Sequence, residues 1–238
     1  MKAEFRSGWS PEAAAQWLAE AVETGNALAT LPDDIAPRDA SEGQAVAFAV
    51  LERLEIPPCG VRLLFRVGLE PLLGPMIEGR MVPSGTPIAL QALRHPVLTA
   101  AVIGVLAEPL HPGVSSAPAF ATLHPAVDIE ATRYANPDED AAASTADLAR
   151  LGLIVGGRGR PLAPHPILAS LGEKGGRRVS AECDLAVAFA KAAQAARDLG
   201  GLPAGALLVV AGLSPPAAPA GIVSASLGKL GRVQARLV

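Results

Sequence analysis

The stretch from His95 to Arg133 contains two segments that constrain the fold more than any other part of the chain. The first, HPVLTAAVIGVLAEPL, is a run of apolar residues typical of a strand that is buried on both faces. The second, VDIEATRY, alternates apolar and polar residues. Because successive side chains of a strand point to opposite faces, Asp128, Glu130 and Thr132 share one face. The stretch therefore predicts two strands, the second with a polar face.

Length and composition fit one large domain, or a core with a helical appendage. The 238 residues are 50% hydrophobic but only 3% aromatic, so the core must consist mainly of Ala, Val, Leu and Ile. The net charge of −3 provides no basic surface, which argues against nucleic acid and anionic membranes as partners. No apolar run approaches the roughly 18 residues that a membrane-spanning helix needs.

The amino end and the cysteines predict a cytoplasmic location. Met1 is followed by polar sequence rather than by the apolar stretch of a signal peptide. Cys59 and Cys183 occur without CxxC or Cys/His spacing. This usage favours two buried thiols in a reducing compartment over a disulfide.

Capping signals predict two helices within residues 1–57, the N-terminal helical segment. Ser10-Pro11-Glu12 supplies a capping hydroxyl, a proline at the first helical position and an early acid, and Gly25 can end that helix. Asp39 with Glu42 three residues later resembles a capping box and begins a second helix, which runs to about Leu54.

Residues 58–238 are expected to form a β-rich core. Ser180 can cap a helix that runs to about Leu199, because apolar residues follow it at helical spacing. On the first strand, Arg62 shares a face with Leu64 and Arg66. Strands are expected at Gly60–Val67, Leu151–Gly157, Ala206–Gly212 and Arg232–Val238.

These segments, in this order, resemble the 2-keto-4-pentenoate hydratase family of the fumarylacetoacetate hydrolase superfamily. The resemblance implies an α+β fold: a mixed β-sandwich roll with N-terminal helices. It also implies bound Mg²⁺ or Mn²⁺, because the family carries a Glu-x-Glu pair on the first strand of the 95–133 stretch and a third Glu on the second. The matching residues here are Thr99, Ala101 and Asp128. Since two of three carboxylates are substituted, we expect the metal to bind weakly or not at all.

Four further positions match the family's active site. Arg62 stands in place of the Lys of a Gly-x-Lys-x-Gly motif; it can hold a substrate carboxylate but cannot transfer protons near neutral pH. The alternative for Arg62 is an exposed position on a surface strand. Glu78 matches an acidic catalytic residue. The resemblance implies substrate binding by Gln44, whose alternative is a solvated helix residue, and by Asp147, in a passage similar to A-D-N-A-S.

Two functions follow from the resemblance. The first is the hydration or decarboxylation of a small 2-oxo or 2-hydroxydienoic acid at a degraded metal site. The alternative is a non-catalytic paralogue that binds a small acid or assembles with a catalytic relative. A homo-oligomer, or an assembly with a related subunit, is expected in either case. Serine hydrolase and zinc chemistries are disfavoured, because the chain lacks a G-x-S-x-G elbow and its four histidines lack zinc spacing.

Overall fold

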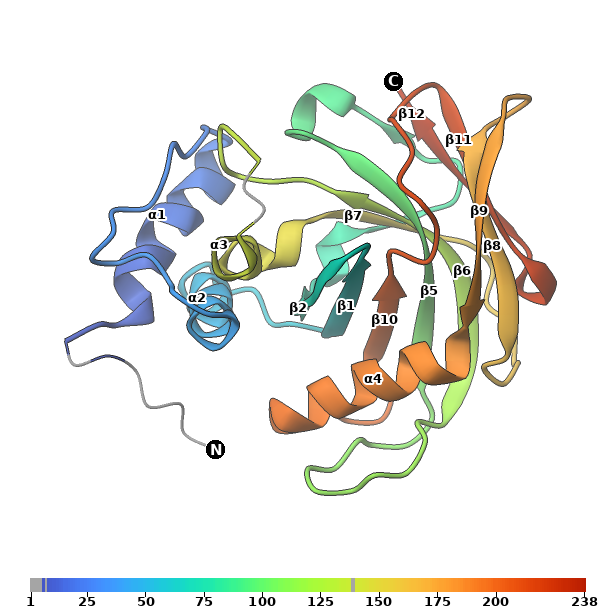
Figure 1. Ribbon diagram of the computed structural model, residues 1–238, viewed down its shortest axis with the longest axis horizontal. Coiled ribbons are helices and arrows are strands. Elements are labelled where there is room, and N and C mark those ends of the chain that lie inside the picture. Colours follow the sequence, from blue (N-terminus) through green and yellow to red (C-terminus); the bar gives the residue numbers. More distant parts are fainter. Residues whose placement is uncertain (1–5, 7, 138–139) are drawn as a thin grey trace.

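The computed structural model describes residue 6 and residues 8–137 and 140–238 (Figure 1). These residues form a mixed α/β structure with two mixed β-sheets and helices packed against them. The amino end, on which the expectation of no signal peptide rests, includes residues 1–5 and 7, which lie outside the described residues, as do positions 138–139. Within the described part, no helix is long and apolar enough to cross a membrane. Cys59 and Cys183 are free thiols and are half-buried rather than buried.

The two amino-terminal helices form where the capping residues predict them. Helix α1 spans Pro11–Thr24 and ends at Gly25, whose φ of 71° is the left-handed conformation that glycine adopts readily. Helix α2 spans Ala40–Arg53, and the carboxylate of its N-cap, Asp39, accepts a hydrogen bond of 2.9 Å from the backbone N–H of Glu42. The limits of both helices agree with the prediction and Asp39 caps α2 as expected, but the side chain of Ser10 makes no capping hydrogen bond at the start of α1.

The larger sheet has seven strands in the order β2-β1-β10-β5-β6-β7-β3. Neighbours are antiparallel except for the parallel pairs β1–β10 and β3–β7. Both strands of the 95–133 stretch, β5 and β6, lie in its interior and pair with each other. The strand bounds are β1 Gly60–Arg66, β2 Leu69–Met76, β3 Met81–Pro83, β5 Val97–Leu106, β6 Phe120–Glu130, β7 Leu151–Gly156 and β10 Leu207–Ala211.

The smaller sheet has five strands in the order β4-β12-β11-β8-β9. One hydrophobic cluster joins the two sheets and includes Val127 of the larger sheet and Ala225 of the smaller. Helix α4 (Leu185–Asp198) adds Phe189 to this cluster. The strand bounds are β4 Pro87–Ile88, β8 Pro166–Glu173, β9 Arg178–Asp184, β11 Ile222–Leu227 and β12 Arg232–Leu237.

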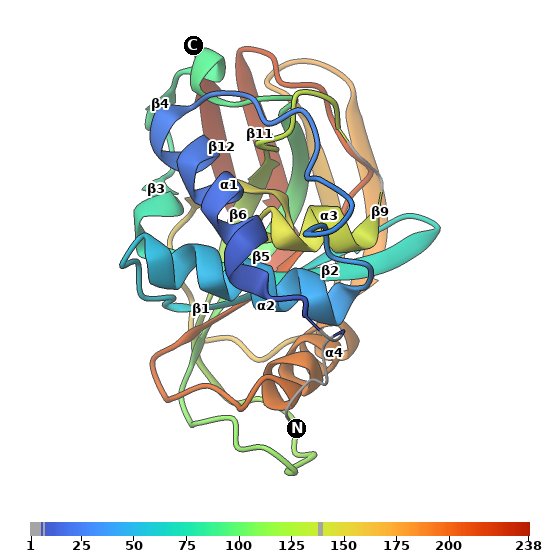
Figure 2. The ribbon, with the colours of Figure 1, turned by 90° about the vertical axis from the view of Figure 1, so that its left-hand side faces the viewer.

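The other face of the larger sheet is covered by α1, α2 and the short helix α3 (Ala141–Ala146), which Figure 2 shows in front of the strands. A second hydrophobic cluster fills this layer, with Leu64 and Ala101 from the sheet and Val46 from α2. Single turns of 3-10 helix join some elements: η1 Glu78–Arg80, η2 Leu90–Ala92, η3 Leu148–Arg150 and η4 Gly228–Leu230. The site described below lies between this sheet face and η3.

The helix predicted to begin at Ser180 begins later. Residues Arg178–Asp184 form strand β9, in which Ser180 pairs with Ser170 of β8. The helix starts at Leu185, because the carboxylate of Asp184 accepts hydrogen bonds from the N–H groups of the next turn, at 2.9 and 3.3 Å. The prediction was wrong because a serine is only one of two possible caps in this segment, and the aspartate is the one used.

Candidate functional site

A row of polar side chains lies on the face of the larger sheet that is turned toward the helices. Thr99 of β5 is paired in register with Asp128 of β6. Arg62 of β1 shares this face with Leu64, since alternate residues of a strand point the same way. Although β10 and β5 lie between their strands, the side chains of Arg62 and Asp128 meet.

Arg62 and Asp128 form a two-pronged ion pair that is completely buried. The Arg62 Nε donates to Asp128 Oδ1 at 2.8 Å, and Nη2 donates to Oδ2. The remaining Nη1 donates to the carbonyl oxygen of Ala149 at 2.7 Å. Both side chains have 0% of their surface exposed. The alternative of an exposed Arg62 on a surface strand is therefore wrong.

Burial and pairing act against each other on the Asp128 carboxyl. Removal from water disfavours the charged form and raises its pKa, and the charge and hydrogen bonds of Arg62 oppose this effect. A buried charge is tolerated when its partner satisfies its hydrogen-bonding capacity. The fork of the guanidinium matches both oxygens of the carboxylate, so Asp128 is satisfied by Arg62.

The turn that closes over this pair has a strained backbone. Leu148, Ala149 and Arg150 have φ values of 53°, 51° and 59°. Three consecutive left-handed residues without glycine are costly, at about 1–2 kcal/mol for each residue. Gly74 of β2 permits the close approach, because a Cβ at this position would lie 2.5 Å from the Cβ of Ala149. The Arg62–Ala149 hydrogen bond is one contact that holds the turn in place.

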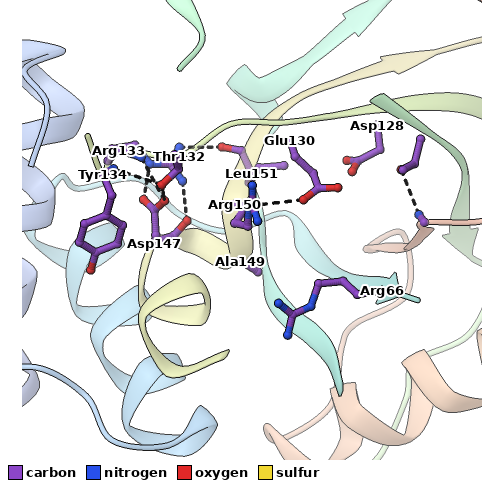
Figure 3. Close-up of polar contacts among 12 residues, drawn as sticks. Arg66, Asp128, Glu130, Thr132, Arg133, Tyr134, Asp147, Ala149, Arg150 and Leu151 are labelled. Carbon is purple, nitrogen blue, oxygen red and sulfur yellow. Dashed lines mark hydrogen bonds and ion pairs between the residues drawn. The ribbon is translucent and has the colours of Figure 1, made fainter. Parts of the chain in front are cut away.

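A second buried network lies at the beginning of the same turn (Figure 3). Thr132 Oγ1 donates to Asp147 Oδ2 at 2.7 Å, and the Arg133 N–H donates to the same oxygen at 3.0 Å. Arg133 Nε donates to the other oxygen, and Nη1 donates to the carbonyl of Leu151 at 2.8 Å. Asp147 thus anchors the turn to the residues that follow β6, and both of its carboxylate oxygens accept hydrogen bonds from them.

Glu130 is a buried carboxyl with one loose ion pair. Figure 3 shows its side chain and that of Asp128 on the same side of β6, with Glu130 directed at Arg150. The Glu130 Oε2 lies 3.5 Å from Arg150 Nε, which is a longer contact than a strong hydrogen bond. Burial raises the pKa of Glu130, and the nearby charge of Asp128 raises it further.

The residues at the three ligand positions do not fit a divalent cation. Both oxygens of Asp128 accept hydrogen bonds from Arg62, Ala101 presents only a methyl group, and the hydroxyl of Thr99 accepts from Gly212 N–H at 3.1 Å. Among the residues that the structure describes, no group of three or more His, Cys, Asp or Glu could hold a metal ion.

The structure brings only some of the expected site residues together. Arg62, Asp128 and Asp147 surround the strained turn, as described above. Gln44 lies on α2 and lines a separate cavity of about 860 Å³ that also contacts α4. Glu78 is exposed on η1, and its side chain makes no hydrogen bond or ion pair with the described residues. The sequence contains no direct signal for the carbonyl of Ala149, whose role depends on the turn.

Solved structures of similar fold cover all or most of this chain. The 4-oxalocrotonate decarboxylase of Pseudomonas putida G7, complexed with magnesium and adipate, is similar over 100% of both chains, with a TM-score of 0.81 and 20% identity. The fumarylpyruvate hydrolase of Pseudomonas aeruginosa, in complex with Mn²⁺ and pyruvate, is similar over 77% of this chain and 90% of its own, with a TM-score of 0.57 and 13% identity.

A third structure, 2-hydroxyhepta-2,4-diene-1,7-dioate isomerase of Mycobacterium marinum, covers 77% of this chain and 76% of its own, with a TM-score of 0.57 and 13% identity. No protein-family model matches the sequence, and no curated protein matches it either. At these identities the likeness concerns the fold alone, and it is consistent with the coarser part of the prediction, a mixed α/β chain with N-terminal helices.

Proposed function

We propose that this chain is a non-catalytic, metal-independent paralogue, built on the β-roll of the fumarylacetoacetate hydrolase superfamily, that binds a small acid or assembles with a catalytic relative. The observation that carries the proposal is the buried ion pair between Arg62 and Asp128. In this pair the guanidinium takes up both oxygens of the carboxyl group that matches a metal ligand of the family.

Displacing the guanidinium would be costly. A cation that bound Asp128 would leave the charge of Arg62 buried without its partner, and an uncompensated buried charge destabilises a protein strongly. It would also weaken the support of the strained turn at Ala149, which accepts from the same guanidinium. These costs support a structural role for the pair.

The same contacts argue against Arg62 as a substrate clamp. Its Nε and Nη2 are engaged by Asp128, and Nη1 is engaged by Ala149. A substrate carboxylate would have to replace one of these acceptors inside a site with no exposed surface. The surroundings of Glu78 do not support a catalytic role either, because its side chain is exposed on η1 and makes no hydrogen bond or ion pair with the described residues.

One observation favours a second candidate, a metal-independent lyase that hydrates or decarboxylates a small 2-oxo acid. The pKa of Glu130 is raised by burial and by Asp128, and a carboxyl with a raised pKa can act as a general acid or base closer to neutral pH. The likeness in fold to a decarboxylase over the whole chain is consistent with this candidate.

Metal titration and activity assays separate the candidates. Protein stripped with EDTA is titrated with Mg²⁺ and Mn²⁺ by calorimetry and assayed by absorbance with 2-hydroxy-2,4-pentadienoate and 4-oxalocrotonate. The proposal predicts no stoichiometric binding of either ion and no turnover above the uncatalysed rate. Tight metal binding that is lost in Asp128→Asn would overturn it. Turnover without metal that is lost in Glu130→Gln would establish the second candidate instead.

Assembly needs a measurement of its own. Light scattering coupled to size exclusion gives the mass of the purified chain, for which we expect a multiple of 24.2 kDa. A monomer at micromolar concentration would contradict the expected homo-oligomer. Small-acid binding and assembly with a catalytic relative would then be the functions left to test.

A further inference from the structure

A cationic pocket lies at the carboxyl end of α1, and none of the three residues that match the family's metal ligands lines it. It has a volume of about 570 Å³, which is enough for a small organic molecule. Its polar walls come from three separate segments of the chain: η1, the segment before β5 and the residues after β6. The polar residues of these segments that line the pocket include Arg80, Arg94, His95, Thr132 and Arg133.

The pocket carries positive charge that the chain does not neutralise. Arg133 is paired with Asp147, but neither Arg80 nor Arg94 forms an ion pair within the described ranges. Arg94 Nη2 donates to the Gly25 carbonyl at 3.2 Å, whereas the Arg80 side chain makes no hydrogen bond to any described residue. None of the lining residues is acidic.

Partial burial makes this arrangement costly for Arg80 in the absence of a ligand. Desolvation lowers the pKa of the Arg80 guanidinium, and the charge of Arg133 lowers it further. A half-buried arginine usually pairs with a carboxylate or with carbonyl groups. Here the guanidinium has only the pocket and another cation beside it, so an anion from solution would supply the missing partner.

The walls of the pocket are held by backbone hydrogen bonds and so are formed in advance. Thr132 N–H donates to the Arg94 carbonyl at 3.1 Å, and Leu28 N–H donates to the Arg133 carbonyl at 2.9 Å. The ring of His95, whose φ is 47°, contacts the Ala135 carbonyl at 2.8 Å. A preformed site loses little conformational freedom when a ligand binds.

We propose that this pocket binds a small dianion, a dicarboxylate or a phosphate monoester, with Arg80 and Arg94 as its anchors. Two unneutralised guanidinium groups match two negative charges, and guanidinium forms charge-assisted hydrogen bonds with both carboxylate and phosphate. The inference rests on the proposed function only in that the function includes binding of a small acid. The evidence for the pocket, its lining residues and their contacts, does not depend on the proposed function.

Calorimetric titration at low ionic strength tests the site with succinate and with inorganic phosphate, and neutral succinamide serves as the uncharged probe. We expect one saturable site for at least one dianion and none for succinamide. The dianion that binds more tightly shows whether the site prefers carboxylate or phosphate groups. Arg80→Gln and Arg94→Gln should each weaken binding about tenfold or more, because each removes a charge-assisted contact.

Arg158→Gln is the matched control, since Arg158 is exposed and does not line the pocket. Thermal melts establish that each variant is folded, and Arg80→Lys should recover part of the affinity. The absence of saturable binding by either dianion would overturn the inference, as would equal weakening by Arg158→Gln. Metal-dependent turnover with dianion binding intact would overturn the proposed function but leave this site in place.

Discussion

The guanidinium groups of Arg62 and Arg80 have contrasting surroundings: the first is buried and paired, and the second lines a pocket without an acidic partner. Arg62 is fully buried, and its donors are engaged by Asp128 and Ala149. Arg80 is half-buried in an open pocket and has no acceptor among the described residues. In the first arrangement the protein itself satisfies the buried charge, and no capacity is left for a ligand. The second leaves binding capacity unused, at a cost to the unliganded protein.

The largest effect is expected from breaking the closed pair. Asp128→Ala should lower the free energy of unfolding by about 3–5 kcal/mol, because it leaves the Arg62 charge buried and unpaired. Urea unfolding followed by circular dichroism measures this change. Replacing both partners, as in Arg62→Met with Asp128→Leu, should recover most of the loss, since no charge is then buried. A double variant as unstable as Asp128→Ala would show that the pair is essential in itself.

Gly74→Ala tests the turn that covers the pair. The added methyl would lie 2.5 Å from the Cβ of Ala149 and 3.0 Å from the carbonyl oxygen of Leu148. Overpacking of this kind costs about 1–3 kcal/mol in unfolding free energy. Gly79→Ala is the matched control, because nothing lies within 4 Å of a Cβ there. Equal melting temperatures for the two variants would contradict the close packing of the turn on β2.

A smaller effect, which depends on pH, is expected at Glu130. Its folded-state pKa is raised, so its contribution to stability is fully present below the unfolded pKa and is lost as pH rises through the folded pKa. Glu130→Gln does not titrate, so its stability relative to the parent should increase as pH rises above about 4, the ordinary value for a glutamate. Urea unfolding of both proteins across this range gives the slope. A relative stability that falls with pH would mean that the Arg150 ion pair outweighs burial.

The smallest effect on stability is expected in the open pocket. Without ligand, Arg80→Gln should leave the unfolding free energy unchanged, or raise it by up to about 0.5 kcal/mol, because it removes a half-buried charge that Arg133 repels. Thermal melts with and without succinate measure both states. The parent should gain more from succinate than the variant does. A clear destabilisation of the variant without ligand would show that Arg80 has a structural role, like Arg62.

The comparison also shows what the sequence can predict. Helix limits at Asp39 and Gly25 follow from local capping chemistry, and the strands of the 95–133 stretch follow from their periodicity. The partner of Arg62 lies 66 residues further along the chain, so its burial depends on a sheet order that the sequence does not reveal. The left-handed turn at Ala149 is equally hidden, because no glycine marks it.

The strand order of the larger sheet has a consequence for how the protein is made. β1 pairs with β10, so β1 has no neighbour on that side until the ribosome has synthesised the chain as far as Leu207. At roughly 5–20 residues per second, the ribosome takes on the order of ten seconds to supply that partner. During this interval the strands β1 and β5 both lack the strand that will lie between them. The nascent chain is therefore open to aggregation until its last third has been synthesised.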